Sequence, residues 1–367
     1  MKYKNFLGDS LSTLGLGTMR LPTLSENNSE IDIAKTSEMI DFAIKNGINY
    51  FDTAWIYHGG NSESVIGEIL SKYPRESYRL ATKFPGFEVG QAENKEKIFE
   101  KQLEKCKVDY FDYYLFHNVC ERNIGWFTDE KYGLFNYLME MKKKGKIRHL
   151  GFSTHGSLHT IKAFLDKYGK DLEFCQIQLN YFDYKYQNAK AKVELLSRYG
   201  KPIWVMEPLR GGMLANPKDE YKAELSKIRE NETAPALAFR FLQSFSEVAV
   251  TLSGMSNMEQ LRENISTFSN FTPLTKSEME GVLKIADSMI ASSEIHCTSC
   301  RYCLEKCPKN IQIPEIMAIY NRYKKGEKNA LETPLLPSEC VGCRACEGAC
   351  PQGIKISEII KNLNFEH

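Results

Sequence analysis

Short apolar runs alternate with longer segments of helical periodicity along most of the chain. The first apolar run, 12–19, precedes a segment whose apolar residues recur at helical spacing until an Asn46–Gly47 stop. The same order then recurs down the chain. The predicted strands cover 12–19, 48–54, 78–83, 112–118, 147–154, 174–181, 202–209 and 248–254, and the predicted helices cover 31–47, 61–70, 94–106, 134–144, 157–167, 186–199, 234–244 and 257–268.

This alternation predicts an α/β fold with a parallel sheet, because a crossover helix returns the chain before each new strand. Eight strand-then-helix units in a segment of this length favour a closed (β/α)8 barrel, or TIM barrel, over an open doubly wound sheet. In such barrels the chemistry lies at the carboxyl ends of the strands. Polar side chains at those ends are therefore the first candidates for function.

Two similar cysteine runs follow the barrel segment: CTSCRYCLEKCP from Cys297 and CVGCRACEGACP from Cys340. Each has the spacing C-x2-C-x2-C-x3-C before a proline, which is the bacterial ferredoxin pattern for [4Fe–4S] clusters. In that pattern the fourth cysteine of each run ligates the other cluster. We therefore expect one cluster on Cys297, Cys300, Cys303 and Cys350, and a second on Cys340, Cys343, Cys346 and Cys307.

Zinc and disulfides are the less favoured alternatives for these cysteines. Zinc ribbons pair two C-x2-C knuckles rather than placing three cysteines in one run. Disulfide frameworks belong to short secreted chains, and the N-terminal stretch MKYKNFLGDS has no apolar core of signal-peptide length. The remaining cysteines, Cys106, Cys120 and Cys175, are expected to be small buried apolar side chains.

The bulk composition is that of a globular protein, with 42% hydrophobic and 26% charged residues. A formal net charge of +1 gives no general footprint for nucleic acid, and no run of about 18 apolar residues predicts a membrane span. We expect a cytoplasmic protein with a barrel at 1–273, a helical connector at 274–293 and a small ferredoxin-like α+β iron–sulfur domain at 294–367.

Four polar residues fall at or just beyond three successive strand ends: Asp52, Tyr57, Lys83 and His117. A free tyrosine has a pKa near 10, poorly matched to acid–base work at neutral pH. An ammonium beside the phenol, such as that of Lys83, would lower this pKa, and Asp52 would keep the ammonium charged. His117 could orient a carbonyl oxygen. Singly, each residue is more often structural, but their conjunction favours catalysis.

These residues stand in a longer series of motifs. The stretch FDTAWIYHGGNSESVIGEIL holds Asp52 and Tyr57, and GFST, QIQLNYFD, EPLRGGML and SGMSNMEQLRENI follow in order. With them the chain resembles the aldo-keto reductase family over residues 1–270 or so. The resemblance implies an oxidoreductase acting on a small carbonyl or alcohol, with Asp52, Tyr57, Lys83 and His117 as its catalytic tetrad. It also implies an NAD(P)H cofactor bound without a G-x-G-x-x-G fingerprint.

The resemblance further implies which residues bind the dinucleotide. Ser153 and Gln178 would hold the carboxamide, 209–212 would form the pyrophosphate loop, and 254–264 would line the adenosine end. Many family members have Asn at Thr154 and an aromatic residue at Met206, and the non-basic Gly254 and Gln260 do not indicate NADP selectivity. The full set is Thr18, Met19, Ser153, Thr154, Gln178, Met206, Leu209, Arg210, Gly211, Gly212, Gly254, Met255, Ser256, Asn257, Gln260, Glu263 and Asn264.

A nicotinamide delivers two electrons as hydride, whereas a [4Fe–4S] cluster passes one at a time. Three interpretations stay open: the clusters relay electrons to a ferredoxin or flavoprotein partner, the clusters are structural or redox-sensing beside an ordinary reductase, or the chain is an electron-transfer module with an inactive barrel. The sequence has no flavin fingerprint, and a bound flavin remains an alternative. Two complete cysteine runs favour the relay, since one cluster would suffice to stabilise a tail.

Overall fold

The chain folds into a closed barrel of parallel strands in the computed structural model, which describes residues 1–25, 28–292, 294–324, 326–327, 330 and 339–365. The strands follow one another in the order β10-β3-β4-β5-β6-β7-β8-β9. Every predicted strand overlaps one of them, so the predicted TIM barrel is confirmed. Their bounds are β3 Leu14–Gly17, β4 Tyr50–Asp52, β5 Arg79–Phe84, β6 Phe111–Val119, β7 Ile147–Thr154, β8 Cys175–Gln178, β9 Ile203–Met206 and β10 Val248–Gly254.

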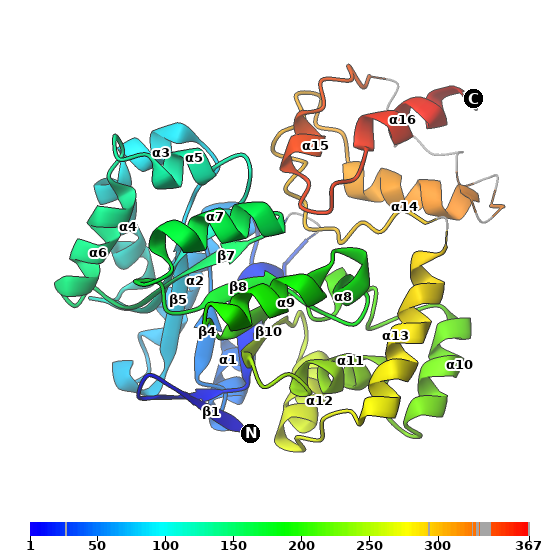
Figure 1. Ribbon diagram of the computed structural model, residues 1–367, viewed down its shortest axis with the longest axis horizontal. Coiled ribbons are helices and arrows are strands. Elements are labelled where there is room, and N and C mark those ends of the chain that lie inside the picture. Colours follow the sequence, from blue (N-terminus) through cyan, green and yellow to red (C-terminus); the bar gives the residue numbers. More distant parts are fainter. Residues whose placement is uncertain (26–27, 293, 325, 328–329, 331–338, 366–367) are drawn as a thin grey trace.

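Helices surround this barrel, each following its strand (Figure 1). The barrel helices are α1 Ile33–Lys45, α2 Ser62–Leu70, α4 Lys95–Cys106, α6 Leu134–Lys143, α7 Leu158–Tyr168, α9 Ala189–Arg198, α11 Ala234–Gln243 and α12 Met258–Ser269. The sequence patterns missed short helices in the loops: α3 Val89–Glu93, α5 Ile124–Thr128, α8 Asp183–Tyr186, α10 Asp219–Ile228, and the 3-10 turns η1 Thr18–Arg20, η2 Tyr57–Gly60, η3 Arg75–Ser77 and η4 Arg210–Gly212.

The predicted helix 186–199 is interrupted near its start. Asn188 has a φ of 51°, in the left-handed region that an α-helix cannot continue through. The chain therefore forms the short α8 first and begins α9 at Ala189.

An antiparallel hairpin that the sequence patterns missed closes the amino-terminal end of the barrel. It consists of β1 Tyr3–Phe6 and β2 Asp9–Ser12. Phe6 and Leu11 from the hairpin join a buried cluster with Tyr50 and Trp204 from barrel strands. The barrel interior is thus filled at this end, which leaves the opposite, carboxyl-terminal end for chemistry.

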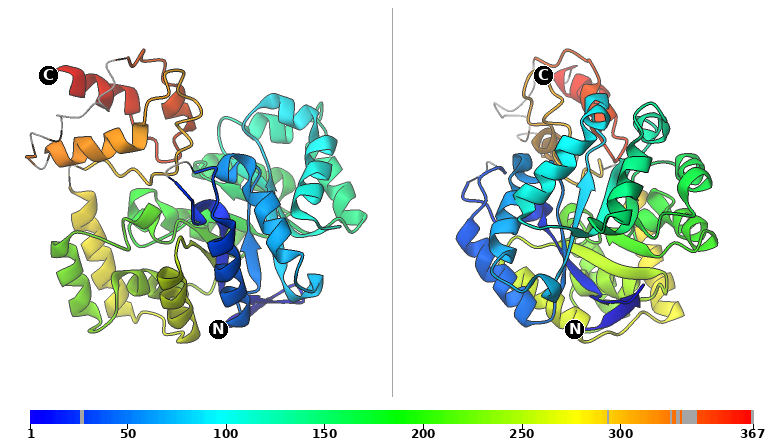
Figure 2. Two further views of the ribbon diagram at one scale, coloured as in Figure 1. Left: turned by 180° about the vertical axis from the view of Figure 1, so that it is seen from behind. Right: turned by 90° about the vertical axis from the view of Figure 1, so that its left-hand side faces the viewer.

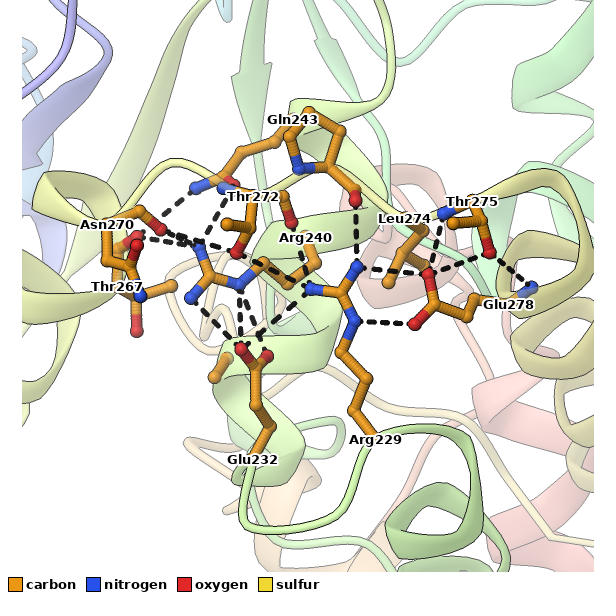
Figure 3. Close-up of polar contacts among 12 residues, drawn as sticks. Arg229, Glu232, Arg240, Gln243, Thr267, Asn270, Thr272, Leu274, Thr275 and Glu278 are labelled. Carbon is orange, nitrogen blue, oxygen red and sulfur yellow. Dashed lines mark hydrogen bonds and ion pairs between the residues drawn. The ribbon is translucent and has the colours of Figure 1, made fainter.

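The predicted connector is the helix α13 Lys276–Ile290, which begins with a capping box between Thr275 and Glu278. Arg229 holds its first turn through two bonds to the Glu278 carboxylate, at 2.6 and 3.0 Å (Figure 3). Arg240 joins Glu232 in the same polar network. The connector is therefore fastened to the outer helices of the barrel before the chain enters the cysteine-rich segment.

The cysteine-rich segment from residue 294 onward, called the iron–sulfur module below, lies at the end of the molecule opposite the hairpin (Figures 1 and 2). It contains α14 Ile313–Lys324, α15 Ala345–Ala349 and α16 Ile356–Phe365, and no strand is assigned in its described residues. Ile316, Met317 and Ile360 form part of a small core of its own. Within the described part of the chain, none of the helices has the length and apolar character needed to span a bilayer.

Candidate active site

A buried ion pair joins the ends of two neighbouring strands. Asp52 ends β4, and Lys83 lies near the end of β5. The Lys83 Nζ donates to Asp52 Oδ1 at 2.6 Å and to the Thr53 carbonyl at 2.7 Å. Both side chains are almost fully buried, so losing either partner would leave an uncompensated charge.

Tyr57 and His117 face this pair from the loop after β4 and from β6. The Lys83 ammonium lies 5.1 Å from the centre of the Tyr57 ring. The rings of Tyr57 and His117 are 6.2 Å apart at an angle of 84°. The structure therefore brings together the four residues that the sequence selected for catalysis.

Lys83 was expected to lower the pKa of the Tyr57 phenol, but this is not the dominant effect on that pKa in the structure. Burial raises the pKa of Tyr57 well above its usual value, and Tyr302, Asp52 and Glu207 raise it further. The carboxylate of Asp52 offsets the ammonium charge of Lys83, so burial determines the direction. At neutral pH the phenol is protonated, which suits it to donate a proton to a carbonyl oxygen.

Burial lowers the pKa of His117 well below its usual value, and the charge of Lys83 adds to this. The imidazole is consequently neutral at neutral pH and carries one N–H. Its Nδ1 is buried without a hydrogen-bond partner among the described residues. A neutral imidazole can donate a hydrogen bond to a carbonyl oxygen without competing with Tyr57 for its proton.

The four residues open into a central cavity of about 310 Å3. The cavity extends from the tetrad past Met206 to α12, a path suited to an elongated ligand. Many predicted cofactor residues line it, namely Met19, Ser153, Met206, Leu209, Gly211, Gly212, Gly254, Ser256, Gln260, Glu263 and Asn264.

Six predicted cofactor residues do not line this cavity. Thr18 donates to the Asp52 carbonyl at 2.9 Å and Thr154 to the Val119 carbonyl at 2.6 Å, so both hold the backbone of the site. Met255 is buried, and Asn257 caps α12 by accepting from the Gln260 N–H. The remaining two, Gln178 and Arg210, bond to Asp183.

Gln176, two residues before Gln178 on β8, is a cavity residue that the sequence did not single out. It lines the central cavity, and its buried Oε1 has no hydrogen-bond partner among the described residues. A buried amide oxygen without a partner is costly unless a ligand satisfies it. A carboxamide N–H of a nicotinamide would do so, and the residues present therefore fit this cofactor at Gln176 rather than Gln178.

Three further polar side chains reach the cavity. His155 lines it, with its Nδ1 lacking a hydrogen-bond partner in the described part of the chain, and Glu207 follows β9. Tyr302 comes from the iron–sulfur module, together with Cys300 and Gln352. No sequence pattern signals that the module contributes to the active site, because this contact arises only in the folded chain.

The eight cysteines of the two runs gather in two sets. One small cavity is lined by Cys297, Cys300, Cys303 and Cys350, and another by Cys307, Cys340, Cys343 and Cys346. These are the two crossed sets expected from the ferredoxin spacing. Among the described residues no three His, Cys, Asp or Glu side chains are close enough to share one metal ion, whereas a four-iron cluster spreads its thiolates over separate iron atoms.

The fold and the tetrad define an oxidoreductase built on a TIM barrel. The family model "Aldo/keto reductase family" matches residues 13–287, and "4Fe-4S dicluster domain" matches residues 296–354. The chain therefore belongs to the aldo/keto reductase family and carries a 4Fe-4S dicluster domain.

Relatives and solved structures agree with this assignment. The uncharacterized oxidoreductase YqkF of Bacillus subtilis is 30% identical over 314 residues, covering 76% of this chain and 95% of that protein. The NADH-specific methylglyoxal reductase of Escherichia coli is 28% identical over 300 residues, covering 70% and 90%. The holo form of the aldo-keto reductase AKR11C1 from Bacillus halodurans shares the fold, with a TM-score of 0.62 and 24% identity over 78% of this chain and 96% of that one.

We predict that Tyr57→Phe lowers the rate of carbonyl reduction by about 10²-fold or more, since it removes only the proton donor. The rate is measured by steady-state kinetics, and folding by circular dichroism. Tyr181→Phe is the matched control, because Tyr181 is also buried but does not line the cavity, and its hydroxyl has no hydrogen-bond partner among the described residues. Wild-type turnover in Tyr57→Phe would remove Tyr57 from the mechanism.

We also predict that iron loss follows the crossed cysteine sets. Wild-type protein prepared without oxygen should hold about eight iron and eight sulfide per chain. Cys350→Ala should lose about half of this iron, and adding Cys303→Ala should remove little more, because both affect one cluster. Adding Cys346→Ala instead should remove nearly all of it. The reverse pattern would show that each run closes its own cluster.

Proposed function

We propose that this protein interconverts a small carbonyl compound and its alcohol with a nicotinamide cofactor, and that two [4Fe–4S] clusters exchange the electrons with an external one-electron carrier. The proposal is carried by the position of Cys300. This member of the first cysteine set lines the same cavity as Tyr57 and Lys83. The hydride chemistry and the first cluster site thus share one chamber.

The barrel residues account for the proton. A nicotinamide, when bound, supplies or accepts the hydride. In reduction the Tyr57 hydroxyl gives its proton to the carbonyl oxygen, while His117 donates a hydrogen bond to that oxygen. The Lys83–Asp52 pair holds a positive group beside the resulting phenolate. In oxidation the same groups act in reverse.

The cysteine sets account for the electrons. Oxidation of an alcohol to a carbonyl releases two electrons and two protons, and two one-electron sites match one such event. The first set adjoins the cavity, whereas Cys343 of the second set is exposed. A path from the cavity to the surface therefore has an inner and an outer site, and a ferredoxin or flavodoxin-type protein is the class of carrier that fits the outer one.

The substrate end of the cavity is polar. Glu207 and Tyr302 lie close enough to Tyr57, and His155 close enough to His117, to shift the pKa of these tetrad residues. These groups favour a small hydroxylated or otherwise polar carbonyl compound over an apolar one, because an apolar ligand would leave them unpaired. The name of the Escherichia coli relative, a methylglyoxal reductase, is consistent with a small polar carbonyl substrate.

The adenosine end favours NADH over NADPH. Gln260, Glu263 and Asn264 line it, and the nearby Arg262 is turned away with its guanidinium 4.2 Å from the centre of the Phe42 ring. A carboxylate near the ribose favours a hydroxyl and disfavours a phosphate. None of the eleven cysteines is joined to another by a disulfide, as expected in the reducing cytoplasm, where we place the protein.

The alternative functions make different use of the same residues. In an ordinary reductase with structural clusters, Cys300 at the cavity would have no role in turnover. In an inactive electron-transfer module, the complete tetrad and the orphaned Gln176 oxygen would have none. An electron relay gives each of these features a function. A flavin that accepts the hydride and passes its two electrons on singly is compatible with this relay.

We predict that NADH, added without oxygen, bleaches the visible charge-transfer absorbance of the clusters, because the first cluster adjoins the cavity. Cys350→Ala should abolish bleaching by NADH but not by dithionite, since no cysteine of the remaining set lines the cavity. The reaction is repeated with added FMN and FAD. If the carbonyl substrate is consumed while cluster absorbance never changes, with or without flavin, the barrel works alone.

We further predict that NADH binds about tenfold or more tightly than NADPH, since the 2′-phosphate would lack a charge-assisted hydrogen bond. Dissociation constants are obtained from nicotinamide fluorescence. Glu263→Gln should narrow the difference by removing like-charge repulsion, and Glu259→Gln on the same helix is the control, because Glu259 does not line the cavity. Tighter binding of NADPH by the wild type would contradict this interpretation.

A further inference from the structure

A segment of the iron–sulfur module lies across the predicted dinucleotide groove. This segment, residues 296–300, is called the strap below. The carbonyl of Thr298 accepts from Arg20 Nη2 at 2.9 Å on the β3 side of the groove. On the β9 side the same carbonyl packs on Gly211, where a Cβ would come within 2.2 Å of it. Arg20, Thr298 and Gly211 thus form a continuous bridge over the groove.

Both ends of the bridge are fixed by the barrel. Arg20 packs over Gly254, and its carbonyl accepts from the Ser256 hydroxyl at 2.8 Å. Arg210, next to Gly211, is fully buried and donates to the His296 carbonyl at 2.8 Å, at the start of the strap. The strap therefore cannot lift from the groove without breaking several buried contacts.

A second attachment lies beside the strap. Gln352, which follows the cluster ligand Cys350 by two residues, accepts from Arg210 at 2.9 Å and from Gln187 at 2.7 Å. It also exchanges hydrogen bonds with Gln178, at 3.2 and 3.4 Å. The module is thus bonded directly to the loop expected to hold the pyrophosphate, and to the strand beside the nicotinamide end.

We propose that the strap retains the dinucleotide as a resident group that is oxidised and reduced in place, instead of leaving after each turnover. This inference rests on the proposed function and deepens it. An enzyme that exchanges its dinucleotide after each turnover needs an open groove. An enzyme that re-oxidises its dinucleotide through clusters can keep the groove covered. The balance is alcohol to carbonyl, with two protons released and two electrons passing singly to the external one-electron carrier.

The proposed resident group is a dinucleotide whose pyrophosphate would lie beneath Arg20 and Gly211. Nicotinamide and flavin adenine dinucleotides both meet this description. The test therefore uses NADH and FAD as separate probes on the complete, cluster-loaded protein. The measured quantity is the dissociation rate of each probe, followed by fluorescence after rapid gel filtration and compared with the turnover rate.

Two adjacent glycines give a matched pair of variants. Gly211→Ala inserts a methyl group against the Thr298 carbonyl and should speed release by about tenfold or more. Gly212→Ala is the control for backbone strain, because Gly212 also has a positive φ, 98°, but no atom of the residues that the structure describes lies within 4 Å of its Cβ position. Its effect on release should be clearly smaller.

Gln352→Ala provides a second variant, in case Gly211→Ala fails to fold. It removes the bonds to Arg210, Gln187 and Gln178 and should also speed release, while retaining the eight cysteine ligands. Retention of one probe by the wild type through many turnovers, with faster release in both variants, would support the strap and identify the dinucleotide.

Two results would overturn the proposal: release of both probes by the wild type within one turnover, or equal release rates in Gly211→Ala and Gly212→Ala. Failure of the strap differs from failure of the relay. If NADH bleaches the clusters but leaves within one turnover, the relay stands and the strap falls. If a retained dinucleotide never changes the cluster spectrum, retention by the strap stands, but the relay and the oxidation of the dinucleotide through the clusters fall.

Discussion

The attachment of the iron–sulfur module to the barrel depends on the hydrogen bonds of one buried guanidinium, that of Arg210. It bonds both carboxylate oxygens of Asp183, at 3.0 and 3.1 Å, and lies 4.7 Å from the centre of the Phe182 ring. Its Nη1 donates to the His296 carbonyl and its Nη2 to the Gln352 side chain, both in the iron–sulfur module. A buried charge is tolerated only when its partners are all in place. One side chain thus sets the position of the pyrophosphate loop, the strap and the first cysteine set together.

The position of the tetrad and the cysteine sets could be predicted because their signals are local. Strand ends, helical periodicity and cysteine spacing are each contained in short stretches of sequence. Which of Gln176 and Gln178 contacts the carboxamide of the nicotinamide could not be predicted from such a short stretch. Residues two apart on a strand point to the same face, so the sequence cannot tell which one meets the cavity. Tyr302 and Gln352 were missed because only the folded chain brings the module against the barrel. The protonation of Tyr57 depends on burial, which no motif reports.

The active site therefore has two sources. The barrel supplies an acid, a neutral imidazole and an ion pair at the ends of consecutive strands, as a TIM barrel readily does. The module supplies one wall, with Tyr302, Cys300 and Gln352. Cys300, a proposed cluster ligand, and Tyr57, the proposed proton donor, line one cavity of about 310 Å3, so their separation is fixed by the fold.

The strap has a consequence for how the protein is made. Domains emerge from the ribosome and fold in order from the N-terminus. The barrel strands, from β3 to β10, are synthesised before Thr298 and Cys350. During that interval the groove between Arg20 and Gly211 is uncovered. A dinucleotide that the strap retains, as proposed, would enter more readily during that interval than after the module has folded over the groove. Maturation would then favour whichever dinucleotide is abundant in the cell while the barrel is being made.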